Sequence, residues 1–381
     1  MTDMELNKVT PRVYVAATRQ DDGKTTCCLG LYAALERKYP RIGYIKPVGQ
    51  RFVEVAGKKV DEDSVLVSDT YDVNLPIEAM SPIAVDRMFT RNYLKEGNLA
   101  EMKETIVSAF NRVAWEHGFV IIEGTGHAGV GSVIDLSNAQ VAKLLGSKVV
   151  IVTTGGVGRP VDEVSLNLAL FEKEGVEVIG VVLNKVLPSK IEALRPWAER
   201  AFARMQLPIL GVIPYLGELR RPILSQVAKE LGGEFLSGES FKRRRVRSIA
   251  IGAMTAARIK EQLGAGSLLI TPGDREDLLL AVLESQPKRT TDSKLAGILL
   301  TDGLKPQPGL LRMMNDKGVP SVAVAADSYS VTAKIERMTV KTDPGDHEKI
   351  KVIQKTVADH LDLGAILKKI WAERVPANSK R

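Results

Sequence analysis

The sequence of 381 residues is long enough for two domains of ordinary size, and its 44% hydrophobic and 26% charged residues are typical of a globular protein. No apolar run approaches the roughly 20 residues of a membrane-spanning helix, and the N-terminus lacks the apolar core of a signal peptide, so we expect no membrane association. The net charge of +7 is modest and aromatic residues make up only 5%, so we do not expect a nucleic-acid partner.

Short β-branched runs alternate with helical periodicity through the first 215 residues. Most of these runs are apolar on both faces, which predicts buried parallel strands. The expected strands cover residues 13–17, 42–46, 119–123, 149–153 and 178–184. Strands that alternate with helices in this way predict an α/β domain with an open, doubly wound, mostly parallel sheet.

The pattern changes between residues 214 and 247, where prolines, glycines and a basic run at 242–247 interrupt it. We interpret the basic run as a solvated hinge that leads into a strand, and an anionic partner is the alternative. Further strands are expected at 248–251, 268–270, 296–300 and 319–325. The sequence therefore predicts three segments: residues 1–215, a smaller α/β domain at 216–345, and a C-terminal helix with a polar tail at 346–381.

A phosphate-binding loop is indicated in the first βα turn. Residues 17–26 follow a buried strand and open a helix, where backbone N–H groups and the helix N-terminus can hold phosphate. Gly23 lets the backbone approach the anion, Lys24 can reach the β- and γ-phosphates, and Thr25 can offer its hydroxyl to magnesium. Thr18 stands where a strict loop has glycine, so the match is to a variant loop with one extra residue. The expected nucleotide-binding residues of this loop are Thr18, Asp22, Gly23, Lys24, Thr25 and Thr26.

Two carboxylates are candidate ligands of a magnesium ion, which prefers oxygen donors shared with phosphates. Glu123 ends an apolar strand, so it lies at the carboxyl edge of the sheet, where ligands of such folds bind. Asp63 lies in an acidic segment, and taken alone it is explained more simply by a solvated loop. Lys46 ends the second strand, where it can neutralise a reacting anion or lie in water.

Three other side chains are weaker candidates. His127 follows Glu123 in a glycine-rich stretch and could act as an acid or base, but a satisfied loop histidine is the simpler interpretation. Cys27 and Cys28 are adjacent, so we do not expect a disulfide between them. We therefore expect the protein to lie in the reducing cytoplasm. We expect both thiols to pack in the core, with a reactive thiolate at the helix N-terminus as the alternative.

The motifs, taken in order, make the first 215 residues similar to dethiobiotin synthetase, and in particular to the dethiobiotin-synthetase-like domain of long bacterial phosphotransacetylases. The motifs are Gly23-Lys24-Thr25, Lys46-Pro47-Val48, Glu123-Gly124-Thr125-Gly126, Asn184-Lys185-Val186 and Ile213-Pro214-Tyr215. The resemblance implies a P-loop NTPase-type fold that binds ATP and Mg²⁺. The resemblance implies that Lys24 binds phosphate and that Lys46 steadies the reacting anion. It also implies that the metal ion is bound by Thr25, Asp63 and Glu123. Adenine would be bound by Asn184 and by the backbone after Pro214.

Residues from about 217 to 340 resemble the DRTGG domain that follows the same module in those phosphotransacetylases. The signature here begins at Thr271-Pro272-Gly273-Asp274-Arg275, and Glu276-Asp277-Leu278 replaces the family's Thr-Gly-Gly. This resemblance implies a role in regulation and subunit contact rather than in chemistry. Residues 346–381 are too few for an acetyltransferase domain, so we do not expect phosphotransacetylase activity from this chain by itself.

Two functions are consistent with these features. The first is an ATP-dependent, ligase-like enzyme that activates a carboxylate or carbamate by phosphorylation, with Lys24 and Lys46 as catalytic residues and an amine as a further substrate. The segment from Arg19 to Asp22, together with Gln50, differs from the biotin enzyme near its diamine substrate, which argues against dethiobiotin synthesis. The alternative is an ATP-binding regulatory or sensor protein of acyl-phosphate or central metabolism with little turnover. A homodimer is expected in either case.

Overall fold

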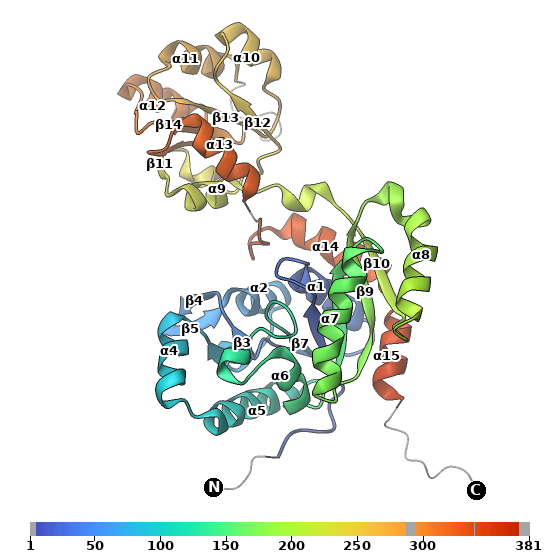
Figure 1. Ribbon diagram of the computed structural model, residues 1–381. Coiled ribbons are helices and arrows are strands. Elements are labelled where there is room, and N and C mark those ends of the chain that lie inside the picture. Colours follow the sequence, from blue (N-terminus) through green and yellow to red (C-terminus); the bar gives the residue numbers. More distant parts are fainter. Residues whose placement is uncertain (1–4, 287–294, 339, 373–381) are drawn as a thin grey trace, which may run out of the picture. The chain divides into compact units, whose positions relative to one another are not determined.

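The chain forms two compact units in the computed structural model, which describes residues 5–286, 295–338 and 340–372 (Figure 1). Of the described residues, the first unit comprises 5–216 and 343–372, and the second comprises those between 217 and 342. The second unit is therefore an insertion in the sequence of the first. The polar tail that the sequence predicts lies in residues 373–381, outside the described residues.

The first unit is built on a sheet whose order is β10-β9-β8-β1-β7-β2, with every neighbouring pair parallel. The strands are β1 (Arg12–Ala17), β2 (Ile42–Ile45), β7 (Phe119–Glu123), β8 (Lys148–Thr154), β9 (Val178–Val186) and β10 (Ile209–Pro214). The first five correspond to the strands that the sequence predicts, except that β2 ends at Ile45, one residue before Lys46. β10 was not predicted, because Gly211 and Pro214 interrupt its apolar run.

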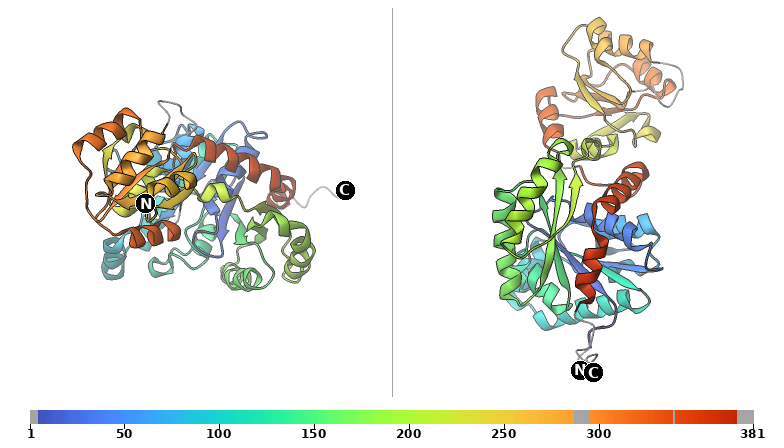
Figure 2. Two further views of the ribbon diagram at one scale, coloured as in Figure 1. Left: turned by 90° about the horizontal axis from the view of Figure 1, so that it is seen from above. Right: turned by 90° about the vertical axis from the view of Figure 1, so that its right-hand side faces the viewer.

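Helices cover both faces of this sheet, so its strands are buried on both sides. The helices between the strands are α1 (Lys24–Leu35), α5 (Leu99–Trp115), α6 (Asn138–Leu144), α7 (Arg159–Lys173) and α8 (Ile191–Ala203). Apolar side chains of α5, α6, α7 and α8 form one core with the sheet, whereas α1 packs on the opposite face (Figure 2). This arrangement confirms the predicted doubly wound α/β fold.

Short elements between β2 and α5 were not predicted. They are β3 (Val48–Gly49), β4 (Phe52–Val55), β5 (Lys58–Asp61), α2 (Glu62–Tyr71), α3 (Ile77–Met80), β6 (Ile83–Ala84) and α4 (Arg87–Glu96). β4 and β5 form an antiparallel hairpin, and α2 begins directly after it. The hairpin and α2 thus place the acidic segment at the edge of the first unit's sheet that carries β2.

The C-terminal segment belongs to the first unit. It contains α14 (His347–His360) and α15 (Leu363–Trp371), which lie on the same face of the sheet as α1 (Figure 2). An ideal Cβ on Gly30 of α1 would lie 2.1 Å from Cβ of Val357 in α14, so the two helices are in close contact. Among the described residues, no helix is long and apolar enough to cross a membrane.

The second unit has a sheet of order β11-β15-β14-β13-β12, in which β11 is antiparallel and the others are parallel. Its strands are β11 (Glu234–Ser237), β12 (Ser248–Ile251), β13 (Ser267–Pro272), β14 (Gly297–Thr301) and β15 (Ser321–Ala323). Its helices are α9 (Leu224–Leu231), α10 (Ala256–Gln262), α11 (Glu276–Ser285), α12 (Pro308–Asp316) and α13 (Ser328–Arg337). This unit is the smaller α/β domain that the sequence predicts.

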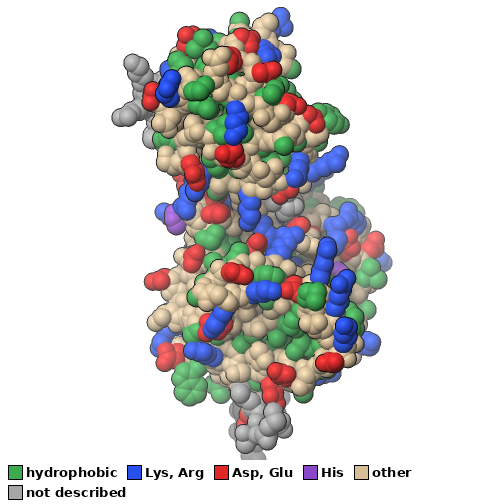
Figure 3. Space-filling model, turned by 90° about the vertical axis from the view of Figure 1, so that its left-hand side faces the viewer, with side chains coloured by type: hydrophobic (Ala, Val, Ile, Leu, Met, Phe, Trp, Pro, Cys, Tyr) green, Lys and Arg blue, Asp and Glu red, His purple; other side chains and the backbone are tan. Residues whose placement is uncertain are grey.

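The basic run at 242–247 leads into β12, as expected, but it is not simply a solvated hinge. Val246 is buried, and the Arg244 guanidinium lies over the Phe241 ring and donates to the carbonyl of Leu295 at 3.0 Å. Positive and negative side chains are interspersed on the face of each unit shown in Figure 3.

Candidate functional site

The first βα turn of the first unit has the backbone geometry of an anion-binding loop. Gly23 adopts φ 101°, a left-handed conformation that favours glycine, and it immediately precedes α1. Within the described residues, no side chain caps α1 and its first turn carries no acidic residue. The first N–H groups of a helix lack intrahelical partners, so this N-terminus is suited to an anion such as phosphate.

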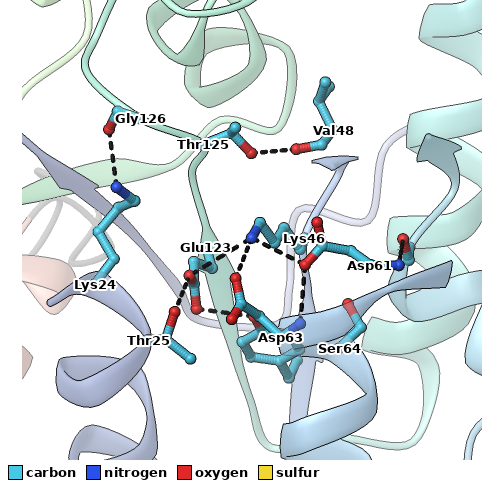
Figure 4. A network of polar contacts seen from close by, with 12 residues as sticks. Lys24, Thr25, Lys46, Val48, Asp61, Asp63, Ser64, Glu123, Thr125 and Gly126 are labelled. Carbon is cyan, nitrogen blue, oxygen red and sulfur yellow. Dashed lines mark hydrogen bonds and ion pairs between the residues drawn. The ribbon is translucent and has the colours of Figure 1, made fainter. Parts of the chain in front are cut away.

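The sequence-predicted metal ligands meet beside this helix N-terminus (Figure 4). The Thr25 hydroxyl, in the first turn of α1, donates to Oε1 of Glu123 at 2.8 Å. The other carboxylate oxygen of Glu123 accepts the Tyr44 hydroxyl at 2.9 Å. Glu123 ends β7 and is 1% exposed, and burial together with the nearby Asp63 raises its pKa. This carboxyl group therefore lies where a cation or an additional hydrogen bond would stabilise its charge.

Lys46 lies at the centre of an acidic cluster (Figure 4). Its Nζ contacts the Asp63 carboxylate directly and lies 2.9 Å from Oδ1 of Asp61 and 3.9 Å from Oε1 of Glu123. Burial lowers the pKa of Lys46, but the three carboxylates outweigh it and the net shift is upward. Lys46 is therefore an ammonium ion held in place by acids, and not a strand-end charge in water.

Asp61 is a site residue that sequence reasoning missed. It is 1% exposed, and its Oδ1 also accepts the backbone N–H of Asp63 at 3.0 Å, so it is the N-cap of α2. The available signal was an Asp two residues before Asp63, which is the position of a helix N-cap. That signal indicates a cap, but it does not indicate a contact with Lys46.

Lys24 is almost completely buried at the start of α1. Its Nζ donates to the carbonyl of Gly126 at 3.0 Å, and burial lowers its pKa. Gly126 lies in the loop after β7, so Lys24 joins the phosphate-binding loop to the segment that follows Glu123. Thr26 follows Thr25 in the first turn of the same helix.

Thr18 and Asp22 shape the interior of the loop. The Thr18 hydroxyl donates to the Asp22 carboxylate at 2.6 Å, and the backbone N–H of Arg19 donates to the same oxygen at 2.9 Å. Asn184, in β9, donates to the carbonyl of Asp22 at 2.8 Å. Pro214 ends β10, next to the end of β9. The side chains of Thr18, Asp22 and Asn184 thus make hydrogen bonds within the site, with Pro214 at the neighbouring strand end.

Two asparagines that the sequence did not single out organise the loop after β7. Asn138 accepts the Tyr14 hydroxyl at 2.7 Å and the backbone N–H of Thr125 at 2.9 Å. Asn167, in α7, accepts the N–H of Ala128 at 2.7 Å and donates to the carbonyl of Thr18 at 3.3 Å. Asn167 therefore joins this loop to the phosphate-binding loop, a contact between distant segments that no local pattern indicates.

The weaker candidates from the sequence are His127, the two cysteines and Gln50. His127 accepts the backbone N–H of Gly129 at 3.2 Å in the loop after β7. Cys27 and Cys28 are buried in α1, where burial raises the pKa of Cys27 to about 12 and that of Cys28 well above its usual value. Gln50 is exposed. The two thiols thus lie in the core, which was the preferred interpretation of the sequence.

The residues present fit a magnesium ion by their chemistry. Thr25, Asp63 and Glu123 supply one hydroxyl and two carboxylates, and Mg²⁺ prefers oxygen ligands completed by phosphates and water. The Thr25 and Glu123 oxygens are already adjacent, at 2.8 Å. Among the described residues, no three His, Cys, Asp or Glu side chains form a metal site by themselves.

The signature of the second unit lies at the carboxyl end of β13. The Arg275 guanidinium pairs with the Asp277 carboxylate at 2.9 Å and donates to the carbonyl of Gly252 at 3.1 Å. An ideal Cβ on Gly273 would lie 1.9 Å from the carbonyl oxygen of Leu304, so only glycine fits there. These contacts hold the loops after β12, β13 and β14 together.

Comparisons with known proteins match both units. Residues 11–223 match the AAA domain family AAA_26, and residues 226–338 match the DRTGG domain. The chain is 31% identical over 365 residues to phosphate acetyltransferase of Pseudomonas putida and 28% identical over 369 residues to that of Pseudomonas aeruginosa. Each alignment covers 92% of this chain and 50% of the relative, so the chain spans about half the length of these curated relatives.

Matches to solved structures are more distant. The septum site-determining protein MinD of Pyrococcus horikoshii, complexed with Mg-ADP, is 19% identical with a TM-score of 0.35, over 55% of this chain and 84% of that protein. The CBS and DRTGG domains of Clostridium perfringens pyrophosphatase, complexed with the activator diadenosine tetraphosphate, are 18% identical with a TM-score of 0.27, over 53% and 84%.

The two domain matches confirm the resemblance inferred from the sequence motifs. The first unit is a P-loop nucleotide-binding domain of the dethiobiotin-synthetase-like type, and the two domains together match the N-terminal half of phosphate acetyltransferases. The AAA match alone spans more than half of the 381 residues. The chain therefore belongs to the AAA_26 family of AAA domains and carries a DRTGG domain in its second unit.

Proposed function

We propose that the first unit binds ATP with Mg²⁺ and transfers the γ-phosphoryl group to a carboxylate or carbamate. The observation that carries the proposal is the meeting of Thr25, Glu123, Lys46 and Asp63 beside the uncapped N-terminus of α1. Phosphoryl transfer depends mainly on positioning and on neutralising charge, and these residues supply both. Asn184 and the backbone after Pro214 are proposed to bind adenine.

The proposed reaction has two steps. An oxygen of the substrate carboxylate attacks the γ-phosphorus, the bond to the β-phosphate oxygen breaks, and ADP leaves with an acyl phosphate as the product. An amine then attacks the acyl carbon, releasing inorganic phosphate and a proton. Lys24 would hold the β- and γ-phosphates, and Lys46 would hold the attacking anion. The magnesium ion, when bound by Thr25, Asp63 and Glu123, supplies further positive charge at the phosphates.

The test is phosphate release from ATP in the presence of bicarbonate and of a panel of organic acids and amines. We expect stimulation by at least one acid, and loss of the stimulated release in Lys24→Ala. Lys38→Ala is the matched control, because Lys38 is exposed in the turn after α1. Nucleotide binding without stimulation by any acid would reject the transfer reaction while leaving nucleotide binding in place.

A second candidate function, regulation by ATP with little turnover, is favoured by a different observation. The chain enters α14 directly after the second unit, and α14 packs along α1, whose first turn carries Lys24 and Thr25. A ligand or assembly event in the DRTGG domain could therefore act on the phosphate-binding helix through α14. Sedimentation with and without ATP tests this function, and a homodimer whose stability shifts with nucleotide is the expected result.

A further inference from the structure

Asp61 lies on the side of Lys46 away from Thr25. In Figure 4 the order across the site is Thr25, Glu123, Lys46 and Asp61. Asp61 is fixed on that side because its backbone N–H donates to the Ser81 hydroxyl at 2.9 Å and its Oδ1 caps α2. Its distance of 2.9 Å to Nζ of Lys46 is therefore set by elements other than the phosphate-binding loop.

The other two carboxylates around Lys46 are also proposed to bind the magnesium ion. Asp63 and Glu123 contact or approach Lys46, and they are also the two carboxylates proposed as magnesium ligands. Oxygens that turn to a metal ion become weaker partners for the ammonium. Lys46 is only 6% exposed, so solvent cannot replace them readily. A buried charge that loses its partners is strongly destabilising.

One carboxylate oxygen of Asp61 can accept a further hydrogen bond. Its Oδ2 is buried and, among the described residues, has no hydrogen-bond partner. An ideal Cβ on Gly49 would lie 2.5 Å from this oxygen, so the backbone of Gly49 packs closely against the carboxylate. Both oxygens of Asp61 are therefore held in a confined place beside Lys46, with one still free to accept a hydrogen bond.

We propose that Asp61 is a positioning residue that keeps the Lys46 ammonium in the site when Asp63 and Glu123 turn to magnesium. The proposal rests on the proposed binding of Mg-ATP. Asp61 acts through Lys46 and touches neither nucleotide nor metal. Its effect should therefore appear only when the metal is present, whereas a merely structural role would affect nucleotide binding with and without metal alike.

The experiment measures ATP affinity by calorimetry in excess Mg²⁺ and in EDTA, for the wild-type chain and Asp61→Asn. Asparagine can still cap α2 but has no charge. We expect affinity in Mg²⁺ to fall at least ~10-fold, which corresponds to about 1.4 kcal/mol, and affinity in EDTA to stay within about threefold of wild type. In a Lys46→Met background, Asp61→Asn should have no magnesium-specific effect, because the residue it positions is gone.

Asp86→Asn is the matched control. Asp86 caps α4 through Phe89 N–H at 2.7 Å and pairs with Lys59 at 2.7 Å, so it has the same two tasks outside the site. It should leave both affinities unchanged. Gly49→Ala is a second variant for the case in which Asp61→Asn does not fold, because the added methyl displaces the Asp61 carboxylate and removes no charge. We expect the same magnesium-specific loss from it.

Equal losses in Mg²⁺ and EDTA, no loss in either, or a magnesium-specific loss that persists in the Lys46→Met background would each overturn the positioning role. Failure of the Mg-ATP binding on which this proposal rests is recognised separately, because the wild-type chain itself would then show no magnesium-dependent binding of ATP.

Discussion

The Thr25 hydroxyl in α1 donates to the Glu123 carboxylate at the end of β7, at 2.8 Å. In the proposed magnesium site the Thr25 hydroxyl oxygen is one of the ligands of the ion, and alanine removes that ligand. Thr25→Ala should therefore weaken magnesium-dependent ATP binding by roughly 10-fold or more. Thr105→Ala is the control, since its hydroxyl donates within the exposed face of α5 to the carbonyl of Glu101. Equal affinities for both variants, measured by calorimetry, would exclude Thr25 from the metal site.

The two thiols should be inert in the folded protein. Alkylation requires an accessible thiolate, and Cys27 and Cys28 are buried with raised pKa values, about 12 for Cys27. We expect no labelling by iodoacetamide at about pH 8 in native conditions and labelling of both thiols in denaturant. Mass spectrometry provides the measurement. Stoichiometric labelling of the native chain would show that α1 opens readily.

Single residues were predictable where a motif or a strand end fixes their place. Lys24 and Thr25 follow from the glycine-lysine-threonine motif, and Glu123 from its position at the end of a buried strand. Asp61 and Asn167 could not be predicted in the same way. Their contacts join segments that are distant in sequence, and an Asp before a helix or an Asn within one has a simpler local explanation.

At the scale of elements, the turn from β1 into α1 depends on one glycine. Gly23 has φ 101°, and an ideal Cβ would lie 2.1 Å from Nδ2 of Asn184. Gly23→Ala should therefore add a collision to the roughly 1–2 kcal/mol of left-handed strain, displacing Asn184 from the carbonyl of Asp22. We expect lower thermal stability and loss of nucleotide binding.

Gly175→Ala separates these two effects. Gly175 has φ 71° and nothing within 4 Å of an added Cβ, so this variant carries the strain without the collision. It should lower stability slightly and leave nucleotide affinity unchanged. Similar nucleotide affinities for the two alanine variants would contradict the importance of the Gly23–Asn184 contact.

Among the elements, the buried strands were the most predictable, because parallel strands covered on both faces are almost continuously apolar. β10 was not predicted, because Gly211 interrupts its apolar run. An ideal Cβ there would lie 2.8 Å from the carbonyl oxygen of His360, so the glycine is required by a contact with the C-terminal segment. The short strands β3 and β6 have two residues each, too few to produce a periodic pattern.

At the scale of the whole chain, the first unit is discontinuous in sequence. Its last two helices follow the inserted second unit, and α14 covers α1. The fold class and the order of the two domains were predictable from the sequence. The return of the chain to the first unit could not be predicted. The amphipathic pattern of a helix shows that one face is buried, but it does not show which element covers that face.

Removing core side chains of α14 should destabilise the phosphate-binding helix. Ile353 is 1% exposed, and Ile353→Ala should lower the free energy of unfolding by about 2–5 kcal/mol. Val352, its neighbour, is 37% exposed, so Val352→Ala is the control and should change stability by less than about 0.5 kcal/mol. Hydrogen exchange in α1 measures the local effect. Unchanged exchange in α1 of Ile353→Ala would mean that α14 does not support it.

Calorimetric titration of the intact chain with ATP, in the presence and absence of Mg²⁺, tests directly whether the first unit is a nucleotide site. We predict saturable binding that Mg²⁺ strengthens by roughly 10-fold or more, and loss of that binding in Lys24→Ala with retention in Lys38→Ala. No binding of any purine nucleotide by the folded wild-type chain in Mg²⁺ would contradict the assignment of this loop as a nucleotide site.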